Sequence, residues 1–264
     1  MHFITLPNTE LTVSRLCYGT GPLKELSDEQ GADLLLAALD EGVNLWDTSD
    51  DYDTHRHVRA ALAQVPRKDV VVISKISDVF DPKAASAHVD AMLEELDTDY
   101  LDVLLLHHVD TRSEWDGYMA ILEALRRPDV HHVGLSSHQP DMVRKAAQEP
   151  AMEVVMAPLN YDGLRIKAAD RQRHRRRMEG AMNACRAAGK GLVAIKVLGG
   201  GELAGRLPAA VSYAFRSGCS DVVDIGMANA TELAEDIAAV NGYLSAMQAH
   251  AAAELRDIAA LLGE

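Results

Sequence analysis

Four side chains that can donate, accept or stabilise a proton follow apolar runs in the first part of the chain. Asp47 and Tyr52 lie in the segment NLWDTSDDY, Lys75 ends the run VVISK, and His107 follows LDVLLL. A free tyrosine has a pKa of about 10 and is a weak acid at neutral pH. A nearby lysine cation favours the phenolate and lowers that pKa, a carboxylate would hold the lysine, and a histidine could position a carbonyl oxygen. If these side chains meet, they form a proton-donating site for a carbonyl that receives a hydride.

Each of these residues also has a purely structural interpretation. Asp and Ser side chains often form turns by bonding to their own backbone, so the acidic run 47–51 could be a turn. Lys75 could extend its amine out of a strand end, a histidine after three leucines is often a core residue, and Tyr52 could pack in a wall. All four nevertheless follow three consecutive apolar runs, which favours one shared site.

Eight short apolar runs alternate with helical patterns, and no linker or change in composition divides the chain. The runs are RLCYGT, GVNLWDT, DVVVISKI, LDVLLLHH, VHHVGLSS, MEVVMAPLN, GLVAIKVLGG and DVVDIGMA. We expect helices near Ser27, at 55–64, from Pro82, at 116–126, from Pro140, at 176–188, at 207–217 and from Thr231, and a last Ala/Leu-rich helix at the end of the chain.

Near-continuous apolar runs of this kind are typical of parallel strands that are covered on both faces. Eight strand–helix units in 264 residues predict an α/β protein, a (β/α)8 TIM barrel made by one domain over residues 1–264. A doubly wound open sheet is the alternative, but no GxGxxG follows the first run. Active sites of such barrels lie at the C-terminal ends of the strands, where the four candidate residues fall.

Composition narrows the class of protein. The formal net charge is −14 and the pI is about 5.2, which argues against a nucleic-acid partner. Cys17, Cys185 and Cys219 are far apart in the sequence, so we expect neither a disulfide framework nor a cysteine zinc site, and a reducing cytoplasm fits best. The N-terminus does not resemble a signal peptide, and no run approaches the roughly 20 apolar residues that a membrane span needs. We therefore expect a cytoplasmic monomer or small homo-oligomer.

The motifs together resemble the aldo-keto reductase family over nearly the whole chain. Asp47 and Tyr52 match its D-T-x-x-x-Y segment, Lys75 its strand lysine, and His107 its strand histidine, which Asp102 precedes as usual. The segment LTVSRLCYGT resembles the opening hairpin and first strand, VGLSSH the G-x-S-N segment, GKGLVAIKVLGGG the seventh strand and loop, and IGMANATELAEDI the last cofactor segment.

The resemblance implies a reductase that interconverts a carbonyl of an aldehyde, ketone or sugar with an alcohol, using NADP or NAD and no metal. Tyr52 would be the general acid, Lys75 would lower its pKa, Asp47 would support Lys75, and His107 would orient the carbonyl. The implied cofactor-binding residues are Gly19, Thr20, Ser136, Ser137, Asn160, Lys196, Leu198, Gly199, Gly226, Asn229, Glu235 and Asp236. The expected substrate contacts are Trp46, His108 and Arg165.

The chain departs from the family pattern at the cofactor segments. Ser137 stands where an asparagine is common, Met156 where a glutamine holds the carboxamide, and Ile195 where a tyrosine stacks on the nicotinamide ring. The sequence is also similar to a bacterial subgroup whose larger members carry an iron–sulfur segment, for which this chain lacks the cysteines. The family usually takes NADPH and often places a Lys or Arg after the glycine that corresponds to Gly226, to pair with the 2′-phosphate. Here no Lys or Arg closely follows Gly226, and Asp236, which would repel that phosphate, replaces a common asparagine. We therefore expect use of NADH, or of both nucleotides.

Three other interpretations stay open. The basic run RQRHRRR at 171–177 could clamp a phosphate, although a charge run is more often a solvated helix face. Asp47 and the histidines 107–108, 131–132 and 138 could belong to a metal-dependent hydrolase on the same barrel, but the pair 131–132 falls at the start of a strand run. The same fold could also act as a sugar lyase or epimerase, with transient oxidation or none.

Overall fold

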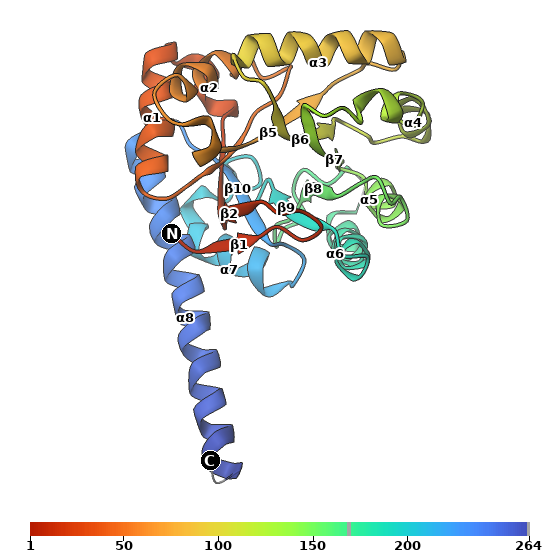
Figure 1. The fold of residues 1–264 in the computed structure, drawn as a ribbon. Helices are drawn as coiled ribbons and strands as arrows, with labels where there is room; N and C mark the ends of the chain where they lie inside the picture. Colours follow the sequence, from red (N-terminus) through yellow and green to blue (C-terminus); the bar gives the residue numbers. More distant parts are fainter. Residues whose placement is uncertain (168–169, 263–264) are drawn as a thin grey trace.

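Eight parallel strands form a closed barrel in the computed structural model, which describes residues 1–167 and 170–262 (Figure 1). The barrel strands are β3 (Leu16–Gly19), β4 (Leu45–Asp47), β5 (Val71–Ile76), β6 (Leu101–Leu106), β7 (Val130–Ser136), β8 (Val154–Pro158), β9 (Gly191–Ile195) and β10 (Val222–Gly226). They pair in chain order, and β10 closes the ring against β3. The predicted (β/α)8 barrel, with its N-terminal hairpin and C-terminal helix, is confirmed.

Helices follow the barrel strands and cover the outside of the barrel. They are α1 (Asp28–Asp40), α2 (His55–Leu62), α3 (Pro82–Leu96), α4 (Arg112–Leu125), α5 (Pro140–Ala146), α6 (Arg171–Ala187), α7 (Leu207–Arg216) and α8 (Ala230–Leu262). Short 3-10 helices lie at η1 (Gly21–Glu25), η2 (Arg67–Asp69) and η3 (Ala204–Arg206). Ser27 and Gln30 form the expected capping box at the start of α1.

The period of two along the strands sorts their side chains into two cores. In β6, Val103 and Leu105 join a cluster inside the barrel, whereas Leu104 and Leu106 join the cluster between barrel and helices. Successive side chains of a strand point to opposite faces, so a strand covered on both faces must be apolar at every position. A polar side chain at an inward position is therefore conspicuous, and such residues form the site described below.

Three helices differ clearly from their predicted bounds. Helix α4 begins at Arg112 rather than at 116, because Thr111 and Glu114 form a capping box there. Helix α6 begins at Arg171 rather than near 176, because the Asp170 carboxylate caps it by accepting a hydrogen bond from Arg173 N. The predicted helix from Thr231 and the last Ala/Leu-rich helix are one continuous helix, α8. Gly242 does not break it, because glycine is tolerated inside a helix at a cost of about 1 kcal/mol relative to alanine. Figure 1 shows the second half of α8 projecting away from the barrel.

An N-terminal hairpin closes the bottom of the barrel. Strands β1 (Phe3–Thr5) and β2 (Thr12–Ser14) pair antiparallel. Leu6 and Val13 belong to the same apolar cluster as the inward residues of the barrel strands, and both are fully buried. A Cβ on Gly191, at the start of β9, would lie 2.7 Å from the Leu6 side chain. The hairpin thus acts as a plug, and the opposite end of the barrel holds the polar residues.

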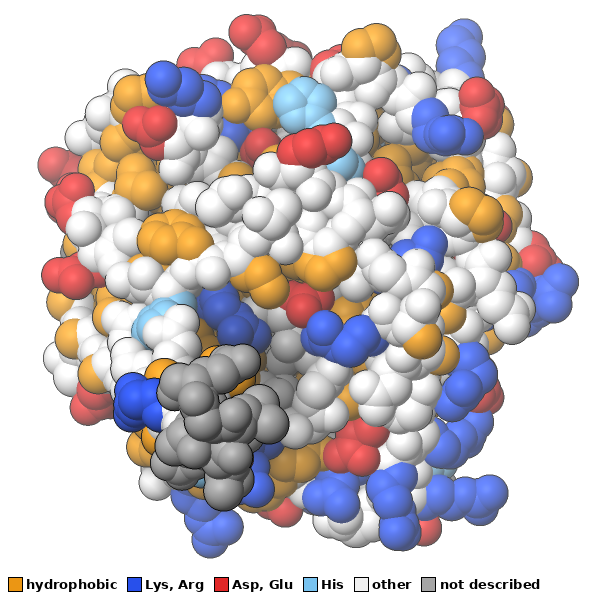
Figure 2. Space-filling model, turned by 60° about the horizontal axis from the view of Figure 1, so that its bottom comes forward, with side chains coloured by type: hydrophobic (Ala, Val, Ile, Leu, Met, Phe, Trp, Pro, Cys, Tyr) orange, Lys and Arg blue, Asp and Glu red, His pale blue; other side chains and the backbone are white. Residues whose placement is uncertain are grey.

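The basic run 171–177 forms the first two turns of α6. Arg171, Arg173 and Arg176 are exposed, and Arg177 is paired with Asp141 across to α5. Figure 2 shows Lys and Arg side chains along one edge of the face it draws. This arrangement is that of a solvated helix face, the more common of the two interpretations. Within residues 1–167 and 170–262, no helix is long and apolar enough to span a membrane.

We expect Leu6→Ala to lower the free energy of unfolding by about 2–5 kcal/mol, because it removes a fully buried side chain from the plug and leaves a cavity. Phe3→Ala is the matched control in the same hairpin, since Phe3 is 50% exposed. Urea denaturation of both variants measures the difference. Equal losses of stability in the two variants would contradict the role of Leu6 as a plug.

Candidate active site

A buried ion pair lies at the C-terminal ends of β4 and β5. Lys75 Nζ is 2.6 Å from both carboxylate oxygens of Asp47 and donates a further hydrogen bond of 2.7 Å to the Thr48 carbonyl. Burial alone would lower the pKa of Lys75, but the Asp47 carboxylate outweighs it and raises that pKa. Burial raises the pKa of Asp47, and Lys75 opposes that shift. The geometry holds a lysine cation against a carboxylate inside the barrel.

Tyr52 covers this pair from the loop that follows β4. The loop continues alongside β5, because Thr48 N donates to Ile73 O and Asp50 N to Lys75 O. Lys75 Nζ lies 4.5 Å from the centre of the Tyr52 ring. Burial raises the pKa of Tyr52 to about 12, Lys75 lowers it, and Asp47 raises it further. Lys75 therefore lowers the pKa of Tyr52, as predicted, but burial and nearby carboxyl groups outweigh the lysine, so the net shift is upward.

His107 lies beside Tyr52 and is fixed by two serines. Its ring makes an edge contact with the Tyr52 ring at 5.7 Å between centres. Nδ1 lies 2.9 Å from Ser77 Oγ and 3.1 Å from Ser49 Oγ. Burial lowers the pKa of His107 to about 2, and the Lys75 charge acts in the same direction. The imidazole is therefore neutral throughout the physiological pH range.

His108 stacks on His107 at the rim of the barrel. The two rings are 3.7 Å apart, and His108 Nε2 lies 3.5 Å from Asp51 Oδ2. His108 has a φ of 52°, in the left-handed region that is uncommon for residues other than glycine. This conformation turns its ring back over His107, and the predicted substrate contact His108 therefore does lie at the mouth, with half of its side chain exposed.

The ligand set of a metal-dependent hydrolase is only partly assembled. Asp51, His107 and His108 offer ligand atoms within 4.8 Å of one another. Asp47 is committed to Lys75, and His138 Nδ1 bonds the Arg165 carbonyl at 2.7 Å. The pair 131–132 lies near the start of β7, at the other end of the barrel. The structure thus does not bring together the histidines on which this interpretation depended.

Asp224 is a buried carboxyl group that sequence reasoning missed. It lies in β10 on the face that points into the barrel, and its Oδ1 is buried without a hydrogen-bond partner among the described residues. A Cβ on Gly19 would lie 2.6 Å from that oxygen, so Gly19 leaves the space that Asp224 occupies. Burial and the neighbouring Asp47 carboxylate raise the pKa of Asp224 well above its usual range. The sequence did contain a signal for Asp224. It lies two residues before Gly226, a predicted site residue, and residues two apart in a strand lie on the same face.

A cleft of about 580 Å³ runs from the ion pair across the ends of β9, β10 and β3. The predicted site residues that line it are Gly19, Asp47, Tyr52, Lys196, Leu198, Gly226, Glu235 and Asp236. Arg165 lies beside it, because its Nε donates to Gly199 O and its guanidinium covers Gly200. Burial, with Glu232 and Glu235 nearby, raises the pKa of Asp236 to about 7.

Other predicted cofactor residues are engaged with the protein itself. Asn160 is fully buried, and its amide bonds the backbone of Leu164 and Lys196. Thr20 bonds the hydroxyl of Thr54. Ser136 is buried at the end of β7, Ser137 Oγ accepts from Gln139 N, and Asn229 caps α8 by accepting from Glu232 N. These contacts assign loop-holding roles to Asn160, Thr20, Ser137 and Asn229.

Trp46 does not reach the barrel mouth, and its prediction as a substrate contact is corrected. The side chain is fully buried in the apolar cluster between barrel and helices, and Nε1 donates to Val43 O. Asp47 points into the barrel, so its neighbour in the strand must point outward. The same parity was readable in the sequence.

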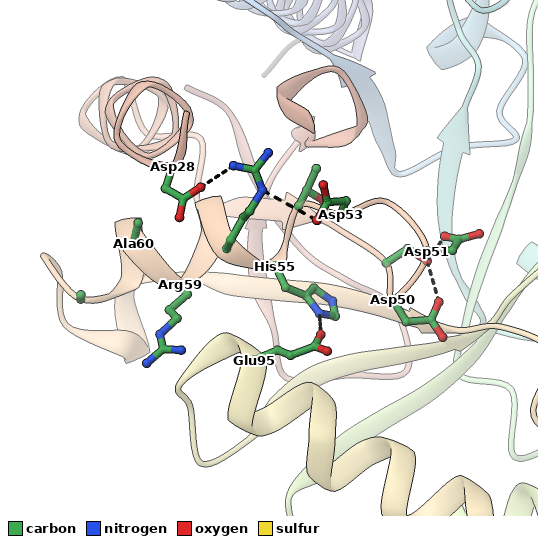
Figure 3. A pocket seen from close by; sticks show the side chains of 12 residues that line it. Asp28, Asp50, Asp51, Asp53, His55, Arg59, Ala60 and Glu95 are labelled. Carbon is green, nitrogen blue, oxygen red and sulfur yellow. Dashed lines mark hydrogen bonds and ion pairs between the residues drawn. The ribbon is translucent and has the colours of Figure 1, made fainter. Parts of the chain in front are cut away.

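A second cavity, of about 730 Å³, lies on the other side of the loop 48–54. Its lining carries charges of both signs, with the acids Asp28, Asp50, Asp51, Asp53 and Glu95 and the cations Arg56 and Arg59. Figure 3 shows Asp28 on one side of this cavity and Asp50 and Asp51 on the other. The short loop therefore separates two spaces, with Tyr52 facing the cleft and Asp50 and Asp51 facing the second cavity.

Known proteins share this sequence pattern and this fold. The model of the aldo/keto reductase family matches residues 15–251. The uncharacterized oxidoreductase YrpG of Bacillus subtilis is 27% identical over 234 residues, which are 78% of this chain and 69% of that protein. The aldo-keto reductase dtxS3 of Metarhizium robertsii is 26% identical over 235 residues, but the match spans only 61% of its length and 74% of this chain.

Solved structures agree in fold. A Pseudomonas aeruginosa protein described as a candidate aldo-keto reductase superposes with a TM-score of 0.77 at 24% identity, covering 92% of this chain and 96% of that one. The holo form of the aldo-keto reductase AKR11C1 of Bacillus halodurans gives a TM-score of 0.74 at 17% identity, covering 91% of each chain. At these identities the likeness shows the barrel alone.

We expect Asp224→Asn to gain stability relative to the wild type as the pH rises. The raised pKa means that folded Asp224 keeps its proton where the unfolded chain has lost it, so this contribution is full at low pH and is lost as the pH rises through the folded value. Between the unfolded and the folded pKa of Asp224, the difference in free energy of unfolding between the variant and the wild type changes by about 1.4 kcal/mol per pH unit. Urea denaturation from pH 5 to pH 9 measures it, with the exposed Asp33→Asn as control. A pH-independent difference would contradict a protonated Asp224.

Proposed function

This chain belongs to the aldo/keto reductase family, and on that premise we propose that it interconverts a carbonyl and an alcohol with a nicotinamide nucleotide, with Tyr52 as the general acid. The main support for this proposal is the buried Lys75–Asp47 pair under the Tyr52 ring. The pair places a fixed cation where a phenolate forms when the tyrosine gives up its proton. A lone buried tyrosine has no such stabilisation.

The cleft fits a nicotinamide nucleotide. A Cβ on Gly226 would lie 2.9 Å from the Pro22 ring, so glycine keeps the floor of the cleft low at this point. Lys196 supplies a cation, and the glycine loop 199–201 supplies backbone that a phosphate can approach closely. For the carboxamide the chain offers Ser136, but Met156 has no strong hydrogen-bonding group. We assign the diphosphate to Lys196 and the glycine loop, and the nicotinamide to the space between Ile195 and Tyr52.

The nucleotide supplies the hydride, and the residues of this chain move the proton. Tyr52 Oη donates its proton to the carbonyl oxygen as negative charge develops there. A pKa of about 12 keeps the phenol protonated at neutral pH, and it is still a stronger acid than water, at roughly 15.7. Lys75 then stabilises the phenolate, and Asp47 keeps Lys75 charged and oriented. His107 orients the substrate beside Tyr52.

The adenosine end of the cleft favours NADH. Glu232, Glu235 and Asp236 line it, whereas Lys196, which we assign to the diphosphate, follows β9. A 2′-phosphate would meet these carboxylates with like charge, whereas a 2′-hydroxyl can donate a hydrogen bond to one of them. This supports NADH, or dual use, for this chain.

We expect Tyr52→Phe to bind the nucleotide as the wild type does but to lose turnover by about 10²–10⁴-fold, because it lacks only the proton donor. Fluorescence titration with NADH and NADPH measures binding, and loss of nucleotide absorbance with simple aldehydes and ketones measures turnover. No binding of either nucleotide at millimolar concentration would overturn the proposed function. Tight binding without net oxidation of the nucleotide would favour the lyase or epimerase alternative instead.

We expect Asp236→Asn to improve the affinity for NADPH roughly tenfold relative to NADH, because it removes like charge beside the 2′-phosphate. In the wild type, the NADPH-to-NADH affinity ratio should fall as the pH rises from 6 to 8, since Asp236 loses its proton with a pKa of about 7. In the variant that pH dependence should be weaker. The exposed Asp33→Asn is the control, and an unchanged ratio in Asp236→Asn would contradict this assignment.

A further inference from the structure

We propose that His107 carries its proton on Nδ1 and presents Nε2 as a hydrogen-bond acceptor, so that the site selects carbonyl substrates with a hydroxyl group on the neighbouring carbon. The substrate class rests on the proposed function, whereas the position of the proton on His107 does not. The chemistry that would be recognised is that of an α-hydroxyaldehyde or α-hydroxyketone.

The position of the proton follows from counting the protons around Nδ1. Ser77 Oγ donates to Asp50 Oδ1 at 2.7 Å, and Ser49 Oγ donates to Asp51 Oδ1, also at 2.7 Å. A hydroxyl has one proton, and a carboxylate has none to return. Both serine protons are therefore used, yet both serine oxygens lie within hydrogen-bond distance of His107 Nδ1. The contacts are satisfied only if Nδ1 is the donor.

The two carboxylates are held in place, which keeps the serine protons committed. Asp50 also accepts from Ser77 N at 2.8 Å, and it lies 2.8 Å from His88 Nε2. Burial acts to raise the pKa of Asp51, but hydrogen bonds from His108 and Ser49 outweigh it and lower that pKa. Asp51 is thus a carboxylate at neutral pH. Rotating either serine toward the imidazole would break a 2.7 Å bond to a carboxylate, and hydrogen bonds to charged groups are the stronger kind.

A neutral imidazole with a proton on Nδ1 has a lone pair on Nε2. The low pKa of His107 excludes the doubly protonated form. Within the described residues Nε2 has no hydrogen-bond partner, and the His108 and Tyr52 rings prevent a free rotation of His107 by packing against it. The acceptor is therefore held on a ring that makes an edge contact with the ring of the proposed proton donor, Tyr52.

A donor and an acceptor side by side match two groups of a substrate. Tyr52 donates to the carbonyl oxygen, which has lone pairs of its own and would be repelled by a second lone pair at Nε2. A hydroxyl on the adjacent carbon can instead donate to Nε2 and bring the carbonyl to Tyr52. Sites built to bond a substrate hydroxyl can reject the analogue without it strongly, by up to roughly 10⁴–10⁵ where the site is closed. The rim here is open at Asp51 and His108, so we expect a smaller preference, about 10–100-fold.

Two measurements test the parts separately. Long-range ¹H–¹⁵N correlation spectra of histidine-labelled protein at pH 7 show which nitrogen carries the proton, and the His107→Asn spectrum assigns the signals. We expect the proton on Nδ1. The second measurement compares kcat/KM within two pairs of substrates that differ only in a hydroxyl or a methyl group on the carbon next to the carbonyl. The pairs are hydroxyacetone with butan-2-one, and glycolaldehyde with propanal. We expect the hydroxylated member of each pair to be preferred about 10–100-fold.

The variant Asp50→Ala/Asp51→Ala frees both serine protons to turn toward Nδ1. We expect its His107 proton to move to Nε2 and the preference for hydroxylated substrates to fall to within about threefold, since the acceptor is lost. The control is Asp53→Asn in the same loop. The Asp53 side chain is 80% exposed, and its backbone is in the left-handed conformation, which asparagine tolerates. This control should keep both the tautomer and the preference.

The outcomes separate this inference from the proposed function. A wild-type proton on Nε2 overturns the inference, even if carbonyls are reduced. A proton on Nδ1 with equal kcat/KM within each pair overturns the substrate class. If neither nucleotide binds, the proposed function fails and the substrate class fails with it, while the spectra still decide the tautomer. A proton on Nδ1 together with a preference that the double variant abolishes supports the whole inference.

Discussion

The ion pair between Lys75 and Asp47 is the interaction on which the rest of the site depends. Both charges lie inside the barrel, and breaking such a buried pair by removing one partner costs roughly 3–5 kcal/mol, because the other charge stays buried and unpaired. Meeting that requirement fixes the ends of β4 and β5 relative to each other. The loop after β4 then has to run along β5, which brings Tyr52 over the lysine. The position of Tyr52 thus follows from the need to keep two buried charges paired.

The same low-dielectric surroundings decide which protonation state the site holds at rest. Burial keeps Tyr52 protonated, and the carboxyl groups of Asp47 and Asp224 add to that effect, while Lys75 opposes it. The resting site is therefore a phenol poised to donate rather than a phenolate poised to accept. Lys75 matters most when negative charge appears on the phenol, because its charge is already in place and needs no reorganisation. In the proposed reaction, this resting state has a proton ready for a carbonyl oxygen at neutral pH.

Much of this arrangement was predictable from the sequence, and the exceptions have physical causes. Near-continuous apolar runs located the strand ends, and the parallel barrel then required Asp47, Lys75 and His107 to meet. Trp46 was misplaced although strand parity argued against it, and Asp224 was overlooked although parity with Gly226 pointed to it. The serine contacts of His107 were not predictable, because they join residues 30 and 58 positions apart whose side chains meet only through loop geometry. The net pKa of Tyr52 depends on burial, which sequence spacing does not reveal.

The acidic run that follows β4 has a different task on each side of one loop. Asp47 and Tyr52 face the cleft at the ends of β9, β10 and β3, whereas Asp50 and Asp51 face the second cavity and accept hydrogen bonds from the two serines that contact His107. A turn needs one Asp or Ser side chain to bond its backbone, so turn chemistry alone does not account for this concentration of acids. Within six residues the chain sets both the donor and its neighbouring acceptor. On the proposed tautomer of His107, the charge of Asp50 and Asp51 would act on the substrate through His107, although both carboxylates line the second cavity.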